Sequence, residues 1–284
     1  MNTLKNQIKN LLWKFWMHHG MGSCNYKGIA GQAHNDKNRY AVHACNNIKQ
    51  AIKETIHNRI SPEEKDCIIQ IEKIRKQFNG NPTPITVIDY GAGNPDIGRS
   101  DEEMKKGIAS VTTYGDICLG SKPALWALLL FKLVRKFQPD LAIELGTCIG
   151  ISAAYQSTAL QLNGKGRLIS IEGSKTIAEL AKKNIESLHL NNTEILCGTF
   201  KEVLPDIFTK IISVDFVFID GHHDEQATID YFELLLPHLS SGAIVVFDDI
   251  SWSKGMRRAW EKICKHSAVV FAVDLKMLGI CGMK

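Results

Sequence analysis

The chain has 284 residues, of which 44% are apolar and 23% are charged, and its formal net charge at pH 7 is +4. These values are typical of an ordinary globular protein. A small net charge without a basic run gives no reason to expect a nucleic-acid partner. The eight cysteines are scattered singly, so the sequence suggests neither a zinc site nor a disulfide framework, and the cytoplasm is the expected compartment. No apolar run approaches the ~20 residues that a membrane-spanning helix needs.

The first segment with a clear period is residues 3–17, which we expect to form an amphipathic helix with its apolar side chains on one face and lysines among the rest. Two interpretations stay open. The helix docks on its own domain or on a second subunit of a homodimer, or it lies on an anionic membrane surface. Residues 18–38 show no period and are expected to form a loop.

Two helices are expected next, over residues 40–58 and 62–78. Ser61 is a candidate N-cap for the second of them. The segment "ITVIDYGAG", near residues 85–93, reads as a strand that runs into a glycine turn. Its glycines could also belong to a cofactor-binding motif, but no long apolar helix and no second strand ending in an acid follow. A structural strand or hairpin is therefore the favoured interpretation.

From residue 121 onward, strands and helices alternate. Near-continuous apolar strands that alternate with helices predict a doubly wound α/β sheet with helices on both faces. The last two strands have a short connection and should be antiparallel. We therefore expect a helical N-terminal extension over residues 1–120 and one α/β domain over 121–284. The strands are expected at 141–145, 167–172, 193–197, 214–219, 242–247, 268–273 and 276–281.

The most informative turn follows the strand at 141–145. Gly146 and Gly150 open it, and a helix follows at once. Such a turn lets a ligand approach the bare backbone, and the helix start offers unpaired N–H groups to a negative group. Glu172, 22 residues after Gly150, ends the next strand, where an acid can accept hydrogen bonds from ribose hydroxyls. These residues predict a nucleoside-containing cofactor.

The pattern Glu144-x-Gly146-x-x-x-Gly150 resembles motif I of the class I S-adenosylmethionine-dependent methyltransferases. The segments "ELGTCIGISA" and "ISIE" are closer still to the catechol-type O-methyltransferases, and the resemblance covers about residues 140–284. It implies a Rossmann-like seven-stranded sheet of order 3-2-1-4-5-7-6. It also implies S-adenosyl-L-methionine as cofactor and O-methylation of a small hydroxylated molecule. The implied cofactor contacts are Glu144, Gly146, Thr147, Gly150, Ser152, Glu172, Phe200, Asp220 and His222. For Phe200 a plain core role is an equal alternative.

Acids also end two later strands, namely Asp220 and the pair Asp248 and Asp249. Three carboxylates at one sheet edge could hold Mg²⁺ or another divalent cation. In the catechol-type family the matching positions are Asp, Asp and Asn, and they bind a metal that activates the acceptor hydroxyl. The alternative is that Asp220 and Asp248 only orient the cofactor and loops, as in metal-free relatives.

His223 stands where the catechol-type family has its lysine base. A histidine suits that task, since its pKa lies near neutral pH and it can take the proton of a hydroxyl. His223 and Asp220 are thus the expected catalytic residues, with His222 as the runner-up base or as a wall for the adenine ring.

Three other functions stay open. One is metal-independent methyl transfer to nitrogen or another acceptor. Another is a non-catalytic role in cofactor binding or assembly. A dehydrogenase is least favoured, because the G-x-G-x-x-G spacing is absent.

Overall fold

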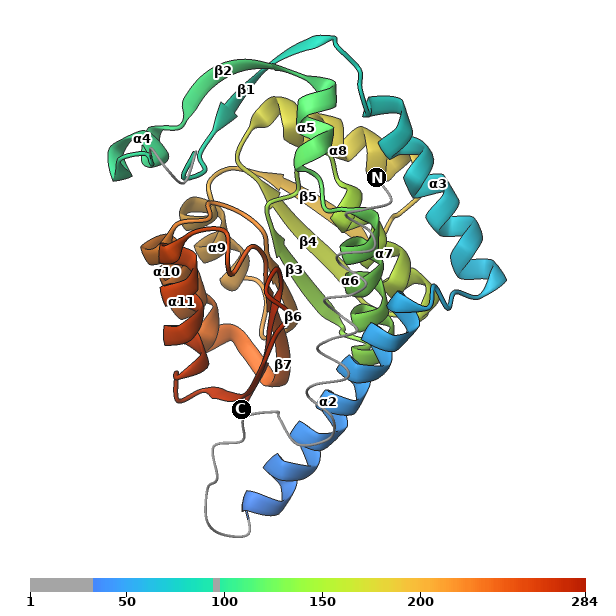
Figure 1. Ribbon diagram of the computed structural model, residues 1–284, viewed down its shortest axis with the longest axis vertical. Coiled ribbons are helices and arrows are strands. Elements are labelled where there is room, and N and C mark those ends of the chain that lie inside the picture. The colour runs from blue at the N-terminus through green and yellow to red at the C-terminus, as the bar shows by residue number, and fades with distance from the viewer. Residues whose placement is uncertain (1–32, 94–97) are drawn as a thin grey trace.

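The computed structural model describes residues 33–93 and 98–284, and its main feature is a seven-stranded sheet of order β5-β4-β3-β6-β7-β9-β8. Neighbouring strands from β5 through to β7 are parallel, and β9 runs antiparallel to both β7 and β8. Numbered from the first strand of this sheet, the order is 3-2-1-4-5-7-6, so the predicted topology is confirmed (Figure 1). The strands are β3 (Leu141–Leu145), β4 (Arg167–Glu172), β5 (Thr193–Cys197), β6 (Val214–Ile219), β7 (Leu239–Phe247), β8 (Val269–Asp274) and β9 (Gly279–Met283).

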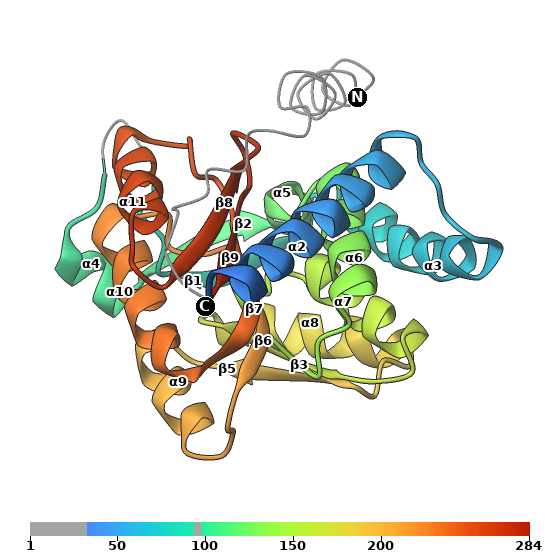
Figure 2. The same cartoon turned by 90° about the horizontal axis from the view of Figure 1, so that it is seen from below.

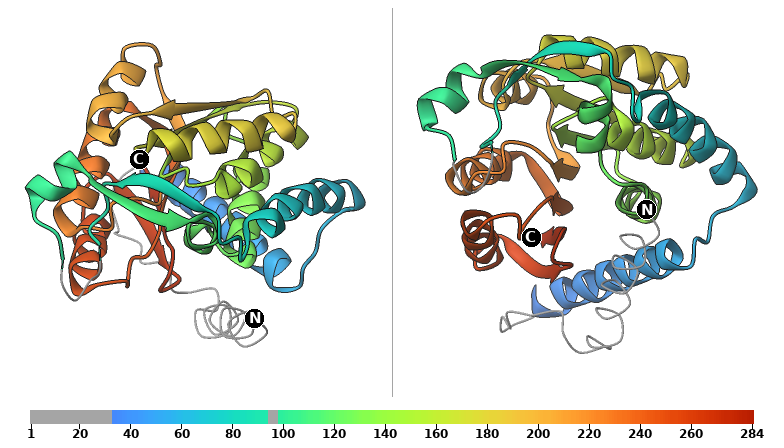
Figure 3. Two further views of the ribbon diagram at one scale, coloured as in Figure 1. Left: turned by 90° about the horizontal axis from the view of Figure 1, so that it is seen from above. Right: turned by 45° about the horizontal axis from the view of Figure 1, so that its top comes forward.

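Helices cover both faces of this sheet, as Figure 2 shows from below and Figure 3 from two further directions. One apolar core joins the sheet to α2, α3, α6, α7 and α8, and a second joins its opposite face to α9, α10 and α11. The first group is α2 (Ala33–Ile56), α3 (Pro62–Phe78), α6 (Ala124–Phe137), α7 (Ile151–Leu162) and α8 (Lys175–Ser187). The second is α9 (Phe200–Phe208), α10 (Glu225–Leu235) and α11 (Lys254–Cys264).

The N-terminal extension is joined to the sheet domain through α6. As its all-round apolar sequence predicts, residues 125–134 of α6 are buried. Among them is Lys132, whose Nζ lies 2.7 Å from Glu64 of α3 and 3.6 Å from Glu54 of α2. Glu64 also completes the capping box with Ser61 that begins α3. Residues on both sides of position 120 belong to one apolar core, so the packing does not change at the predicted domain boundary. The division into two domains there stays a prediction.

Helix α2 begins at Ala33, whereas the sequence predicted a loop up to residue 38. That expectation was wrong for residues 33–38, because the segment AHNDKN has no apolar period from which a helix could be predicted. The predicted helix over 3–17 and the rest of the predicted loop lie outside the described residues.

The segment near 85–93 forms part of a separate two-stranded antiparallel sheet of β1 (Pro84–Asp89) and β2 (Ile108–Thr113). This confirms the predicted strand, but the sequence had not indicated β2. The connection contains a short helix, α4 (Asp101–Lys106), and α5 (Tyr114–Gly120) follows β2. The two strands extend across the end of the main sheet where β3 and β4 finish (Figures 1 and 3).

No single helix in residues 33–93 and 98–284 is both long enough and apolar enough to cross a bilayer. Helices α5 and α6 together meet the length and the apolarity required, but a bend of 51° separates them. Cys45 on α2 is disulfide-bonded, which the scattered cysteines had not indicated.

Replacing Lys132 by methionine should destabilise the fold by about 3 kcal/mol, because it leaves the buried carboxylate of Glu64 without its nearest cation. The methionine keeps most of the aliphatic stem, so the change isolates the charge. Chemical denaturation measures the difference. Lys106→Met is the matched control, since the Lys106–Glu102 pair is exposed and should contribute almost nothing. Equal stability of the two variants would contradict a structural role for the buried pair.

Candidate active site

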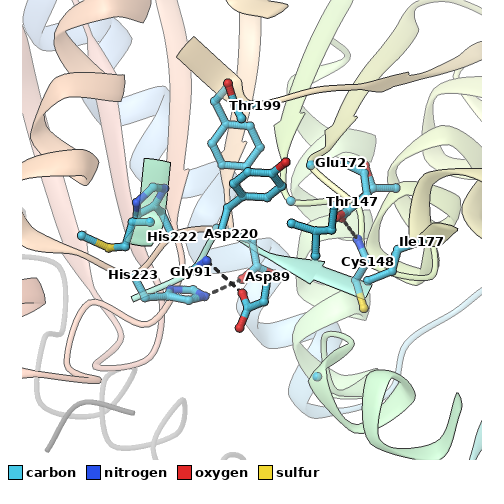
Figure 4. Close-up of a pocket in the computed structure, with 18 of the residues that line it drawn as sticks. Asp89, Gly91, Thr147, Cys148, Glu172, Ile177, Thr199, Asp220, His222 and His223 are labelled. Carbon is cyan, nitrogen blue, oxygen red and sulfur yellow. Dashed lines mark hydrogen bonds and ion pairs between the residues drawn. The ribbon is translucent and has the colours of Figure 1, made fainter. Parts of the chain in front are cut away.

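A cavity of about 890 Å³ lies at the carboxyl ends of β3, β4 and β6, where the strand order reverses. Ligands of open α/β sheets bind at this kind of switch point. The cavity is lined from both parts of the chain (Figure 4): the glycine turn and the β6–α10 turn form opposite walls, and β1 with the residues after it closes one side.

The glycine turn begins where β3 ends. Gly146 has φ of 101°, and a Cβ at this position would collide with the carbonyl of Asp220. Its N–H donates to the carbonyl of Ile171 at 3.0 Å. Only glycine permits this close approach, which brings the turn after β3 against the turn after β6. Gly150 also has positive φ and caps α7, but it does not line the cavity.

Glu172, at the end of β4, lines the cavity across from the β6 turn. Its two carboxylate oxygens accept hydrogen bonds from the backbone N–H groups of Cys148 (2.9 Å) and Ser174 (3.0 Å). Burial raises the pKa of Glu172, and the two hydrogen bonds oppose that rise. The carboxylate is therefore held in one orientation, with lone pairs left to accept further hydrogen bonds.

Glu144, which the resemblance put among the cofactor contacts, lies behind the glycine turn and does not line the cavity. Its carboxyl group is fully buried and accepts hydrogen bonds from Ser170 and from Gln156 Nε2 (2.8 Å). Burial raises the pKa of Glu144 to about 8. The hydrogen bonds of Glu144 thus connect β3 to β4 and to α7 beneath the glycine turn. With this pKa, its carboxyl group is mostly protonated and uncharged near pH 7.

Three more of the expected cofactor contacts line the cavity, namely Thr147, Ser152 and Phe200. The Phe200 ring packs edge-on against Tyr231, with ring centroids 5.2 Å apart. It also lies so close to Gly221 that a Cβ there would overlap it. Phe200 is therefore both a packed residue and a part of the cavity wall.

The turn after β6 carries the expected catalytic residues. His222 and His223 both have positive φ, 71° and 52°, which non-glycine residues rarely adopt. Backbone hydrogen bonds hold the turn, including one of 2.7 Å from Ala92 of the extension to the His222 carbonyl. As a result, His223 Nε2 lies 3.8 Å from Asp220 Oδ1, and the His223 ring lies 5.8 Å from that of Trp252.

His222 has a different environment from His223. Its Nδ1 is hydrogen-bonded with the hydroxyl of Tyr231 at 2.9 Å. Burial lowers the pKa of His222 and raises that of Tyr231, so near neutral pH an uncharged ring is hydrogen-bonded with a neutral tyrosine hydroxyl.

The predicted metal ligands Asp220, Asp248 and Asp249 do not form a metal-binding group. Within the described ranges, no cluster of three His, Cys, Asp or Glu side chains is arranged to hold a metal ion. Instead, the ammonium of Lys122 pairs with Asp248 and lies 3.4 Å from Asp220. The donor set therefore does not fit a divalent cation in this arrangement.

Lys122, Asp89 and Tyr90 were not among the predicted site residues. Lys122 and both hairpin residues line the cavity, and the Tyr90 ring covers Gly173 beside Glu172. One signal was available for Lys122. A lysine directly before a buried apolar helix opposes the helix dipole and so needs carboxylates nearby. Nothing in the sequence indicated how the hairpin folds over the sheet.

The comparisons with known proteins agree with this geometry. Residues 143–250 match a family profile described as a methyltransferase domain. This segment is thus similar to a methyltransferase domain, and it includes most of the strands of the seven-stranded sheet. Its sheet and glycine turn resemble those of the caffeoyl-CoA-type O-methyltransferases.

Two curated relatives and one solved structure illustrate the similarity. A Sulfurisphaera tokodaii protein named a probable cobalt-precorrin-6B C(15)-methyltransferase (decarboxylating) is 31% identical over 126 residues, 43% of this chain and 60% of the relative. An Arabidopsis thaliana protein provisionally named a caffeoyl-CoA O-methyltransferase is 26% identical over 152 residues, 53% of this chain and 63% of the relative. The chain thus spans about three fifths of the length of these relatives. An O-methyltransferase from Bacillus cereus, solved with S-adenosylhomocysteine, is 25% identical with a TM-score of 0.52, over 58% of this chain and 83% of that one.

Glu144 makes the stability of the methyltransferase domain depend on pH. In the unfolded chain Glu144 titrates near 4.5, and in the folded chain its pKa is about 8. Between these values the folded state holds the extra proton, so the stability that this group contributes falls as pH rises from about 5 to 8 and then levels off. Glu144→Gln should flatten this part of the profile. The amide can accept from Gln156 and donate to Ser170, whose own proton then turns to Thr147.

Melting temperatures at closely spaced pH values, from 5 to 9, measure the effect. Glu186→Gln, on the exposed side of α8, is the matched control and should keep the wild-type profile. A Glu144→Gln profile as steep as that of the wild type would show that Glu144 is ionised throughout this range.

Proposed function

We propose that this protein transfers a methyl group from S-adenosyl-L-methionine to a hydroxyl group of a small molecule. One observation carries the proposal. One cavity is lined by the glycine turn, by Glu172 and by Asp220 with His223. The methyltransferase names of the similar proteins support the same reaction class.

The cofactor side of the cavity fits a nucleoside with an amino-acid tail. Gly146, Thr147 and Ser152 line this part of the cavity and would lie beside that tail. The fixed carboxylate of Glu172 accepts from the ribose hydroxyls, while Phe200 and His222 border the adenine. When bound, this group supplies a sulfonium that already activates the methyl group, so the protein has to position the acceptor.

His223 is the proposed general base. With the cofactor bound and the methyl group transferred to the acceptor oxygen, the His223 ring would take the proton of the acceptor hydroxyl. Asp220, 3.8 Å from Nε2, stabilises the positive charge that the ring gains. His222 is the less suitable base, because its Nδ1 is already hydrogen-bonded with the Tyr231 hydroxyl.

Glu172→Gln should weaken the binding of S-adenosylhomocysteine at least about tenfold, since an amide cannot accept on both of its terminal atoms. Isothermal titration calorimetry measures this directly, with NAD as a second titrant that should not bind. Glu179→Gln, on the exposed side of α8, is the matched control. Unchanged affinity in Glu172→Gln, or tight binding of NAD, would argue against the proposed cofactor site.

His223→Gln should slow methyl transfer by about 10²-fold or more while leaving the affinity for S-adenosylhomocysteine nearly unchanged, since only proton transfer is lost. Transfer of labelled methyl groups into a metabolite extract measures turnover, and calorimetry measures binding. The exposed His189→Gln is the control. Full turnover in His223→Gln would remove this residue from the mechanism without touching the cofactor site.

A further inference from the structure

Lys122 lies between the carboxylates that end two neighbouring strands. Its Nζ is 3.4 Å from Asp220 Oδ2, after β6, and it contacts Asp248 Oδ2, after β7. The side chains of Lys122 and Asp248 are buried, with exposed fractions of 7% and 2%. The ammonium thus occupies the position from which a bound cation would bridge these two acids.

The chain places a lysine here at a cost that only these acids offset. Lys122 directly precedes Pro123, the N-cap of α6, where the helix dipole disfavours a cation. Burial of an ammonium group is also unfavourable unless it is paired. The backbone is fixed as well, since Arg75 of the extension donates to the Lys122 carbonyl at 2.8 Å. Lys122 is therefore held at its backbone carbonyl by Arg75 and at its ammonium group by the two carboxylates.

The charges of these groups match the proposed reaction without a metal. Asp220, Asp248 and Lys122 together carry one negative charge, which a sulfonium in the cavity would neutralise. Methyl transfer removes the sulfonium charge and leaves a proton on His223, so the total stays at zero. If a divalent cation lay beside Lys122, the two carboxylates, Lys122, the cation and the sulfonium would together carry a charge of +2 in a largely buried site.

We propose that Lys122 is the resident cation of this site, in place of a divalent metal. It is a positioning residue: it neutralises Asp248 and holds Asp220 where that carboxylate faces His223. The consequence for methyl transfer rests on the proposed function, whereas the exclusion of a metal by Lys122 is a property of the chain alone.

The test is a titration of the purified full chain with Mn²⁺, followed by electron paramagnetic resonance of the free ion. The wild type should leave Mn²⁺ free up to about 1 mM, the weak limit of protein sites for hard cations. In Lys122→Ala the two acids lose their cation, so this variant should bind Mn²⁺ at least about tenfold more tightly. Mn²⁺ should also raise the melting temperature of Lys122→Ala and not that of the wild type.

Two control variants assign the gained site. Lys122→Arg keeps the charge and should exclude Mn²⁺ as the wild type does. The double variant Lys122→Ala with Asp248→Asn should lose the Mn²⁺ that the single variant gains. A purely structural role for Lys122 would destabilise the alanine variant without creating a metal site, so a folded Lys122→Ala that gains no Mn²⁺ overturns the proposal.

If Lys122→Ala does not fold, the wild type and Asp248→Asn decide the question. A wild-type Mn²⁺ site that Asp248→Asn abolishes overturns the proposal, and the absence of such a site supports it. The titration needs no cofactor, so its outcome is independent of methyl transfer. Calorimetry with S-adenosylhomocysteine on the same preparation tests the proposed function separately.

Discussion

The contact on which the site depends is the close approach of two backbone turns, at Gly146 after β3 and at Asp220 after β6. A Cβ at Gly146 would overlap the Asp220 carbonyl, so the side chain is excluded and the turns pack directly on each other. The Asp220 N–H donates to the Leu145 carbonyl at 2.8 Å and extends the parallel pairing of β3 and β6 by one bond. Because of this contact, the proposed cofactor wall and the proposed base belong to one rigid unit.

Charge is the second constraint, and it joins the extension to this unit. Two buried lysines hold the extension's partner helix α6 in place. Lys132 pairs with acids of α2 and α3, while Lys122 pairs with the acids after β6 and β7. Both ends of α6 are thus fixed by ion pairs between segments distant in sequence. The N-terminal helices therefore influence the site through α6, and the β1–β2 sheet contributes wall residues to the cavity directly.

Much of the fold could be predicted because its signals are local. The strands at 141–145, 167–172, 193–197 and 214–219 have the bounds that their apolar runs predicted. Glu172 was singled out for the same reason, since it ends a strand, whereas His223 was singled out by the resemblance to the catechol-type family. The sequence did not indicate that Glu144 lies outside the cavity lining, because the bounds of a strand do not reveal which of its faces a side chain occupies. Its neighbours Ser170 and Gln156 come from two other elements, and only packing brings them together.

The sequence alone determined the class of fold, the order of the strands, the glycine turn and the acids and histidines at the strand ends. Periodicity, turn chemistry and a resemblance carried by short motifs are all properties of contiguous residues. Only the tertiary structure decided that Lys122, some 100 residues before Asp220 and 126 before Asp248, supplies the cation between them. It also decided that the hairpin near Asp89 covers the cavity. Both depend on how buried charge and apolar surface are paired across the whole chain, and no local pattern records that pairing.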